Sequence, residues 1–194
     1  MSTHTAAAPG PRKRDPEATR RAILDAAAEI AVEQDAAALT HRAVAARAGL
    51  ALGSTTRYFE SIDDLREATL RMLGDEVDAY LVQVEQDLAS CDDPAECLAA
   101  SMHDFLVDSR QVHAIMALIT AASSNASLRS LALRFADRLT DLVAAHVGRE
   151  RAVAAGVYLD GAMIHAALHD APLSRDAVTQ VLRAIFAMPE TGGR

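Results

Sequence analysis

The thirteen residues RAGLALGSTTRYF, at positions 47–59, concentrate side chains that hydrogen-bond to phosphate and other acceptors: two arginines, three hydroxyl side chains and a tyrosine. No Asp or Glu lies between Asp35 and Glu60, although the chain contains 27 acidic residues among its 194. Arginine forks and hydroxyl groups donate hydrogen bonds to phosphate oxygens, whereas carboxylates are repelled by them. The pattern therefore predicts a surface that faces a polyanion.

The charge of the whole chain hides this local character. Residues 1–59 contain eight Lys or Arg and six acidic residues, which gives a net charge of +2. Residues 60–194 contain eleven Lys or Arg and 21 acidic residues, which gives a net charge of −10. The sum is the formal net charge of −8. This asymmetry indicates a polyanion-binding part attached to an acidic second part.

The composition favours an all-α fold of about nine helices. Hydrophobic residues make up 51% of the chain, with only nine Gly and six Pro, and no segment has the alternating pattern of a strand. Cys91 and Cys97 match no metal or redox spacing, so we expect two free thiols in a reducing compartment. The longest apolar run, near 114–122, is too short to cross a bilayer and the N-terminus has no apolar signal core, so we expect a soluble, cytoplasmic protein.

Helix-start and helix-stop residues divide the N-terminal third into three helices. The first begins after Asp15 and Pro16, the second runs from a cap at Thr40 to about Arg47, and the third lies within 52–58. Gly49 follows the second helix, where a left-handed conformation suits glycine. Ser61 and Asp64 resemble a capping box that opens a long helix over 62–89.

Five more helices are expected in the remaining residues. The fifth opens at DDPAEC (92–97) and ends near Asp108, the sixth contains QVHAIMALITAA (111–122), and an SSNAS loop follows it. The seventh carries Leu128 to His146 and stops before Gly148, the eighth covers 151–170, and the ninth is capped by Ser174. The predicted organisation is a flexible arm (1–15), a helical domain that carries the polyanion-facing surface (16–61), a second helical domain (62–188) and a flexible tail (189–194).

Two short helices joined by a glycine-containing turn, the second of them polar and without acids, are typical of a helix-turn-helix. Its second helix fits the DNA major groove, where Arg57 is the side chain best suited to read a base. The residues expected to contact DNA are Thr40, His41, Arg42, Leu52, Gly53, Ser54, Thr55, Arg57 and Tyr58. The alternative is an ordinary helical hairpin in which the absence of acids is chance. The basic residues 12–14 either touch DNA or stay solvated.

The segments TRRAILDAAAEIAVEQ and LTHRAVAARAGLALGSTTRYFESIDDL together resemble the DNA-binding domain of the tetracycline-repressor (TetR) family of transcriptional regulators. The resemblance covers about residues 17–70. Three positions depart from the commonest pattern: Ala51 replaces a capping residue, Thr56 an aromatic, and Ile62 a lysine that meets phosphate. Loss of that lysine removes one salt-sensitive contact to DNA.

The resemblance implies a ligand-responsive repressor that binds a near-palindromic double-stranded operator as a homodimer and requires no cofactor. It further implies that the last two helices form a four-helix bundle with those of the second copy. The residues expected in this interface are Gly156, Ala162, Ala166, Val178, Val181, Leu182 and Ile185. The alternative is that these faces close the core of a single chain.

The resemblance also implies a pocket for a small, largely apolar effector in the second part of the chain. Candidate lining residues are Met102, His103, Phe105, Leu106, Met116, Ile119, Phe135, Leu139, Tyr158 and Met163. Methionines suit adaptable cavities, but an apolar stripe of this kind also fits plain core. His103 and His113 could orient a polar group of the ligand.

Other functions have weaker support in the sequence. His165 and His169, with Asp170 beside them, have metal-compatible spacing but lack a third clear ligand. The nucleophile-elbow, P-loop and dinucleotide-binding patterns are absent, so we expect no enzymatic activity. Two rival classes remain open: a helical small-molecule-binding protein that regulates nothing through DNA, and a helical enzyme that uses its histidines.

Overall fold

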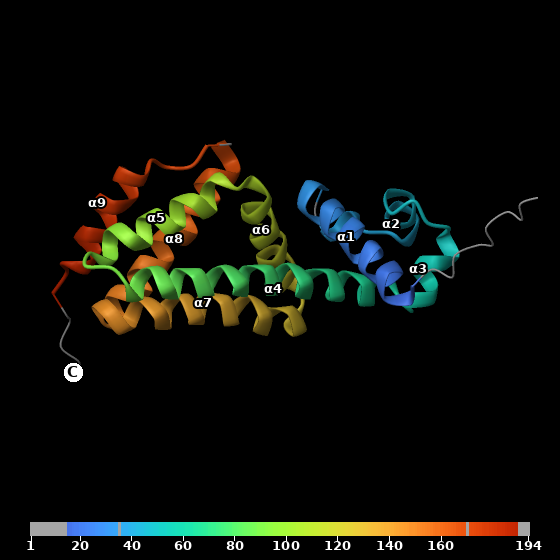
Figure 1. Ribbon diagram of the computed structural model, residues 1–194, viewed down its shortest axis with the longest axis horizontal. Helices are drawn as coiled ribbons and strands as arrows, with labels where there is room; N and C mark the ends of the chain where they lie inside the picture. The colour runs from blue at the N-terminus through green and yellow to red at the C-terminus, as the bar shows by residue number, and fades with distance from the viewer. Residues whose placement is uncertain (1–14, 35, 170, 190–194) are drawn as a thin grey trace, which may run out of the picture.

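The computed structural model describes residues 15–34, 36–169 and 171–189, which form helices without any strand (Figure 1). The predicted all-α fold is confirmed within these ranges. The expected arm, including the basic residues 12–14, and most of the expected tail lie outside the described residues. The elements are α1 (Pro16–Gln34), η1 (Ala36–Ala38), α2 (His41–Arg47), α3 (Leu52–Tyr58), α4 (Ile62–Ala89), α5 (Pro94–Val107), α6 (Ser109–Ser124), α7 (Ala126–Val147), α8 (Arg149–His169) and α9 (Arg175–Phe186).

Local hydrogen bonds fix the ends of α2 where the sequence predicts them. The Thr40 hydroxyl accepts the Ala43 N–H at 3.1 Å and caps the start of the helix. At its end Gly49 has φ 64°, and the Leu50 N–H donates to the Ala45 carbonyl at 2.9 Å. Because this left-handed turn strains any side chain, it explains the glycine that separates α2 from α3.

The long helix α4 connects the two parts of the molecule. Ser61 and Asp64 form the predicted capping box, with bonds of 3.0 and 3.1 Å between each side chain and the other residue's N–H. The helix has 28 residues and is therefore about 42 Å long. It starts beside α1 and α3 at one end of the elongated molecule and runs along α7 into the bundle formed by α5 to α9 (Figure 1).

Two clusters of buried residues form the core, and α6 contributes to both. One contains Val112 and Ile115 of α6 with residues of α4, α5, α7, α8 and α9. The other joins α1, α2 and the first half of α4 to Ala117 and Leu118 of α6. The core of the helix-turn-helix is thus completed by residues beyond position 61.

Three local expectations were wrong. The SSNAS segment is not a loop, because Asn125 alone separates α6 from α7. The helix α6 begins earlier than expected, at Ser109, because the Asp108 carboxylate accepts the Arg110 and Gln111 N–H groups at 3.0 and 3.3 Å. Cys91 and Cys97 form a disulfide rather than two free thiols, since the turn between α4 and α5 brings their Cα atoms to 6.5 Å.

Candidate nucleic-acid interface and ligand cavity

The outer face of α3 consists of Leu52, Gly53, Thr56 and Arg57, all of which are exposed. Leu52 is 52% exposed, so its side chain is available for contact with another molecule. Thr55 was expected to contact DNA, but it is 0% exposed, and its hydroxyl donates to the Leu52 carbonyl at 2.9 Å and lies 3.5 Å from the His41 carbonyl. Thr55 therefore joins α3 to α2 and cannot reach a groove. Thr56 takes its place on the outer face.

The space in front of Gly53 is open. A Cβ atom built at this position would meet no atom within 4 Å, and the backbone is not in the left-handed region. The fold itself therefore gives no reason for a glycine there. A molecule that approaches this part of the backbone closely would explain the glycine.

The three arginines of α2 and α3 differ in their ion pairs. Arg47 bridges to Glu29 at 3.1 Å and to Glu33 at 2.7 Å, so it ties α2 to α1. Its hydrogen bond holds the pKa of Glu33 below the usual range. Arg42 and Arg57 are exposed and make no hydrogen bond or ion pair with any described residue. Two cations therefore remain available for a polyanion.

The other predicted DNA contacts lie around this face. Thr40 is exposed, while His41, Ser54 and Tyr58 are partly buried. The Nδ1 atom of His41 is buried without a hydrogen-bond partner among the described residues. Eight of the nine predicted residues are thus exposed or partly buried on α2, on α3 and at the cap of α2, whereas Thr55 is fully buried.

A cavity of about 410 Å³ lies between α6, α7 and α8. Nine of its twelve lining residues are apolar, and the remaining three are Ser123, Arg129 and Asp160. The lining residues are Ile115, Leu118, Ile119, Ala122, Ser123, Arg129, Ala132, Leu133, Phe135, Ala136, Asp160 and Met163. A largely apolar cavity of this size with few polar groups is typical of small-molecule sites.

Only Ile119, Phe135 and Met163 of the predicted ligand-binding residues line this cavity. Met116 lines a smaller hollow of about 260 Å³ between α1 and α6, and His103 Nδ1 lies 3.1 Å from the Leu173 carbonyl oxygen. Tyr158 packs, partly buried, against the core of the bundle. The prediction is corrected for Met102, Phe105, Leu106 and Leu139, which are buried in that core. Their side chains fill the space between packed helices, so the plain-core alternative holds for them.

Asp160, the acidic group of the cavity lining, was not among the residues predicted from the sequence. Burial raises the pKa of its carboxyl group, and no described residue hydrogen-bonds or pairs with it. Arg129 lines the same cavity but does not contribute to this shift. Asp160 is nevertheless an exposed residue, so its carboxylate lines the cavity within reach of solvent. A carboxylate in this position, without a counter-ion among the described residues, can pair with a ligand that brings its own positive charge. Asp160 and Met163 are three residues apart, which places both on one face of α8. This spacing could have identified Asp160 from the sequence.

Four residues predicted in a dimer interface lie inside the single chain. Ala162, Ala166, Val178 and Leu182 are buried in the core of the bundle, so this part of the prediction is wrong. Val181 is exposed, and Gly156 and Ile185 are partly so. The apolar side chains that α8 exposes are instead Val153, Val157, Ile164 and Leu168.

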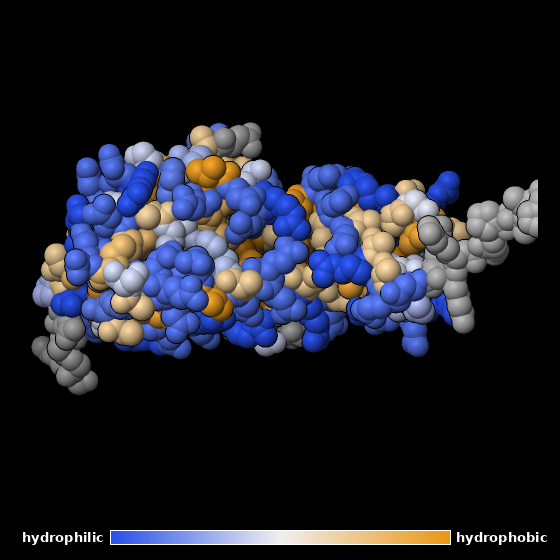
Figure 2. Space-filling view, in the orientation of Figure 1, coloured by the Kyte–Doolittle hydropathy of each residue, from blue (hydrophilic) through white to orange (hydrophobic). Residues whose placement is uncertain are grey.

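These four side chains recur on one face of α8, since positions 4, 11 and 15 residues apart align on a helix, and the exposed Asp160 lies on the same face, seven residues after Val153. Val157 is 67% and Leu168 76% exposed. In the view of Figure 2 hydrophilic residues cover most of the surface, and hydrophobic areas are small. A row of exposed apolar side chains along one helix indicates an interaction surface.

The remaining histidines make local contacts. His113 Nδ1 lies 2.6 Å from the Ser109 carbonyl oxygen, and the rings of His165 and His169 are 4.3 Å apart. Asp170 lies outside the described residues. Among those described, no group of three or more His, Cys, Asp or Glu side chains could hold a metal ion.

Comparison with known proteins agrees with this geometry. Residues 23–69, which contain α2 and α3, match the family model of bacterial regulatory proteins, tetR family. A member of the TetR family from Streptomyces coelicolor, SCO1917, is 30% identical, with a TM-score of 0.77 over 88% of this chain and 99% of its own. The chain belongs to the TetR family. It has the fold of the family's transcriptional regulators, with their DNA-binding helix-turn-helix.

Two further structures of TetR-like fold contain bound dyes. The multidrug binding protein EbrR in complex with proflavin is 31% identical, with a TM-score of 0.70 over 86% of this chain and 99% of its own. Its complex with malachite green has 28% identity and a TM-score of 0.74 over 92% and 100% of the two chains. No protein of curated function matches the sequence. In the described part of this TetR-family chain, no helix is long and apolar enough to span a membrane.

Proposed function

We propose that this TetR-family protein is a ligand-responsive repressor. As a homodimer it binds a near-palindromic operator and releases the DNA when a small, largely apolar effector enters the cavity between α6, α7 and α8. The observation that carries the DNA-binding part is the acid-free outer face of α3, where Arg57 is exposed and has no partner among the described residues.

Each exposed group on this face has a separate role at the operator. Arg57 reads a base edge, because its planar fork matches the two acceptors of guanine. Thr56 and Leu52 contact neighbouring base edges and methyl groups, and Gly53 lets the backbone come close. Arg42, at the start of α2, binds phosphate and fixes the position of the protein on the duplex.

The dimer forms through the exposed apolar stripe of α8, together with Val181 of α9. A two-fold axis there would present two α3 helices to successive major grooves, about 34 to 36 Å apart. Symmetry of the protein then requires near-symmetry of the operator.

The effector is a flat or compact apolar molecule that carries a positive charge. Asp160 supports this charge preference, since its exposed side chain lines a largely apolar cavity and has no counter-ion among the described residues. EbrR supports it independently, because proflavin and malachite green are aromatic cations. A bound cation would pair with Asp160 while the apolar lining buries the rings.

The helix α6 transmits binding to the DNA. Leu118 and Ala122 line the cavity and also belong to the core cluster that contains α1. Arg110 of α6 pairs with Glu76 of α4 at 2.8 Å, so a shift of α6 also pulls on α4. Movement of α1 and α4 changes the separation of the two α3 helices, and with it the affinity for the operator.

Selection of bound fragments from fragmented genomic DNA with the purified protein tests this function. We expect recovery of a shared, near-palindromic sequence whose binding weakens steeply with salt. Arg57→Ala should lower the affinity for this sequence by about 1 to 3 kcal/mol and relax the preference at one base position. Arg149→Ala is the matched control, since it removes the same charge from an exposed residue of α8.

Two results would contradict the proposal. Fragments without a common sequence would favour the small-molecule-binding protein that regulates nothing through DNA. Equal binding by the Arg57→Ala and Arg149→Ala proteins would remove Arg57 from the interface.

A further inference from the structure

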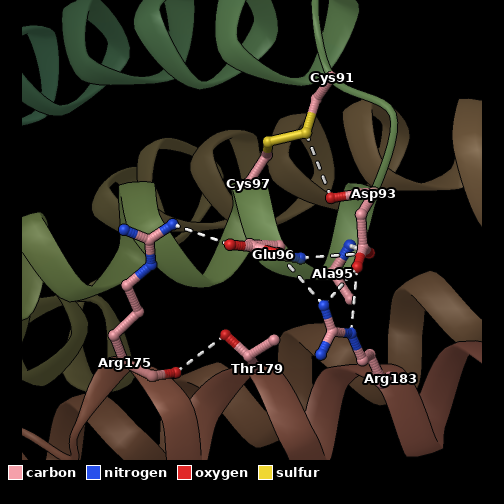
Figure 3. A network of polar contacts seen from close by, with 8 residues as sticks. All are labelled: Cys91, Asp93, Ala95, Glu96, Cys97, Arg175, Thr179 and Arg183. Carbon is pink, nitrogen blue, oxygen red and sulfur yellow. Dashed lines mark hydrogen bonds and ion pairs between the residues drawn. A yellow bond between two sulfur atoms is a disulfide. The ribbon is translucent and has the colours of Figure 1, made fainter.

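A covalent bond closes the loop between α4 and α5. Cys91 follows the end of α4, Cys97 lies in the first turn of α5, and their disulfide spans the segment 91–97 (Figure 3). Both cysteines are only partly buried. A bridge in this position is within reach of an external thiol, unlike one sealed in the core.

The closed segment contains the carboxylates that hold α9. Asp93 Oδ1 accepts the Ala95 N–H at 3.0 Å and caps α5, while Asp93 Oδ2 accepts Arg183 Nε at 3.0 Å and Nη2 at 2.6 Å. Glu96 accepts Arg183 at 3.2 Å and lies 3.5 Å from Arg175. Figure 3 shows both arginines reaching from α9 toward this one segment.

The pKa shifts of Asp93 and Arg183 have the same origin, their mutual hydrogen bond. The hydrogen bond from Arg183 is the largest cause that lowers the pKa of Asp93, and the same bond raises the pKa of Arg183. The other charged group facing Asp93 and Arg183 is Glu96. One carboxylate thus caps α5 and binds α9 at the same time, so its position depends on the conformation of the loop that the disulfide closes.

We propose that Cys91 and Cys97 form a reversible thiol–disulfide site, and that its reduction loosens the attachment of α9 to the α4–α5 loop. The co-reactant is a dithiol. Its first thiolate attacks one sulfur, forms a mixed disulfide and releases the other cysteine as a thiolate that takes up a proton. Its second thiolate then breaks the mixed disulfide, so the protein gains two S–H groups in total and the dithiol becomes a disulfide.

Reduction changes the loop in two ways. The segment 91–97 regains the backbone freedom that its closure removed. Cys91 Sγ lies 3.2 Å from the Asp93 carbonyl oxygen, so the new S–H group faces an acceptor of the residue that caps α5. Both changes act on Asp93, and through it on Arg183 and α9.

Hydrogen–deuterium exchange of the full-length protein tests the site, with oxidised protein compared with protein reduced by dithiothreitol. We expect residues 175–186 to exchange about two- to fivefold faster after reduction, as loss of a partly exposed ion-pair network predicts, with α1 to α3 unchanged. Alkylation followed by mass measurement should count two thiols in the reduced protein and none in the oxidised one.

Variants separate this mechanism from general loosening. Cys91→Ser/Cys97→Ser should exchange like the reduced protein and ignore dithiothreitol. Arg183→Gln should give the oxidised protein the faster exchange of α9. Equal exchange of residues 175–186 in both redox states, or two alkylated thiols in protein treated with oxidant, would overturn the proposal. These readouts need neither DNA nor effector, so a failed repressor assignment would leave them unaffected.

Discussion

At the residue scale, the side of α3 that faces outward decides which side chains can meet DNA. The sequence predicts the length of the helix, the absence of acids and the importance of Arg57. It could not distinguish Thr55 from Thr56, because the rotation of α3 about its axis is set by packing on α2. The structure resolves this through the hydrogen bonds of the buried Thr55 hydroxyl to Leu52 and toward His41.

Gly53→Ala should separate DNA binding from folding. The added methyl group meets no atom of the protein, and alanine favours a helix over glycine by up to about 1 kcal/mol, so the free energy of unfolding should stay equal or rise. Affinity for the operator should fall, because the methyl group keeps α3 from the groove. Chemical denaturation and fluorescence anisotropy with labelled operator measure the two quantities.

Gly49→Ala is the control for this substitution. It should lower the free energy of unfolding by about 1 kcal/mol, because φ 64° strains a side chain. Unchanged operator affinity in the Gly53→Ala protein would mean that Gly53 does not approach DNA.

Asp160→Asn tests the charge preference of the cavity through its pH dependence. Burial raises the folded-state pKa of Asp160 above the unfolded value of about 3.9, so the folded state binds more protons between the two values. The stability contributed by this group is therefore lost as pH rises through that interval. Relative to the native protein, Asp160→Asn should become more stable as pH rises from about 4 and keep that advantage at neutral pH.

The same substitution should weaken binding of the cationic dye proflavin by up to about fivefold, because an ion pair with an exposed carboxylate contributes about 0.2 to 1 kcal/mol. Thermal denaturation over a pH series and dye fluorescence titration measure the two effects. A constant stability difference across that series, or full-strength dye binding, would remove Asp160 from the proposed role.

At the scale of elements, capping residues made the helices predictable. Thr40, Ser61, Asp93 and Ser174 each cap a helix where the sequence places one. The disulfide and the cavity were not predictable in this way. Both depend on which helices meet in three dimensions, and spacing along the chain does not encode the approach of α6, α7 and α8.

Leu118→Ala tests the role of α6 as the link between cavity and DNA. Leu118 is buried and belongs to both the cavity lining and the core cluster of the helix-turn-helix, so its truncation should cost about 2 to 5 kcal/mol of stability. Among the molecules that remain folded, dye binding should survive while its effect on operator affinity shrinks. Phe135→Ala is the comparison, since Phe135 lines the cavity and packs against the other cluster only. Full coupling in Leu118→Ala would argue against α6.

At the scale of the whole molecule, the apolar faces of α8 and α9 divide into a part buried in the core and an exposed part that we propose as the dimer interface. The sequence indicated that these faces are apolar, but it could not divide them between the core and an interface. Packing of α9 against α5 takes up Val178 and Leu182, which leaves the outer stripe of α8 for another molecule.

Val157→Asp should prevent formation of the proposed dimer and leave a folded monomer. A buried, unpaired carboxylate at the centre of the stripe would oppose association, whereas in the monomer the side chain stays in water. Sedimentation analysis measures the mass in solution. Val107→Asp is the matched control, because Val107 is 60% exposed at the end of α5 and lies outside the stripe. Equal masses for the two variants would place the interface elsewhere.

Coupling between the proposed effector cavity and the operator surface is measured by the affinity for dye with and without operator DNA. Coupling of about 1 to 3 kcal/mol predicts that saturating operator weakens proflavin binding 5- to 150-fold, and that saturating proflavin weakens operator binding by the same factor. A dye affinity that is unchanged by the operator would contradict the account, however tightly each partner binds alone.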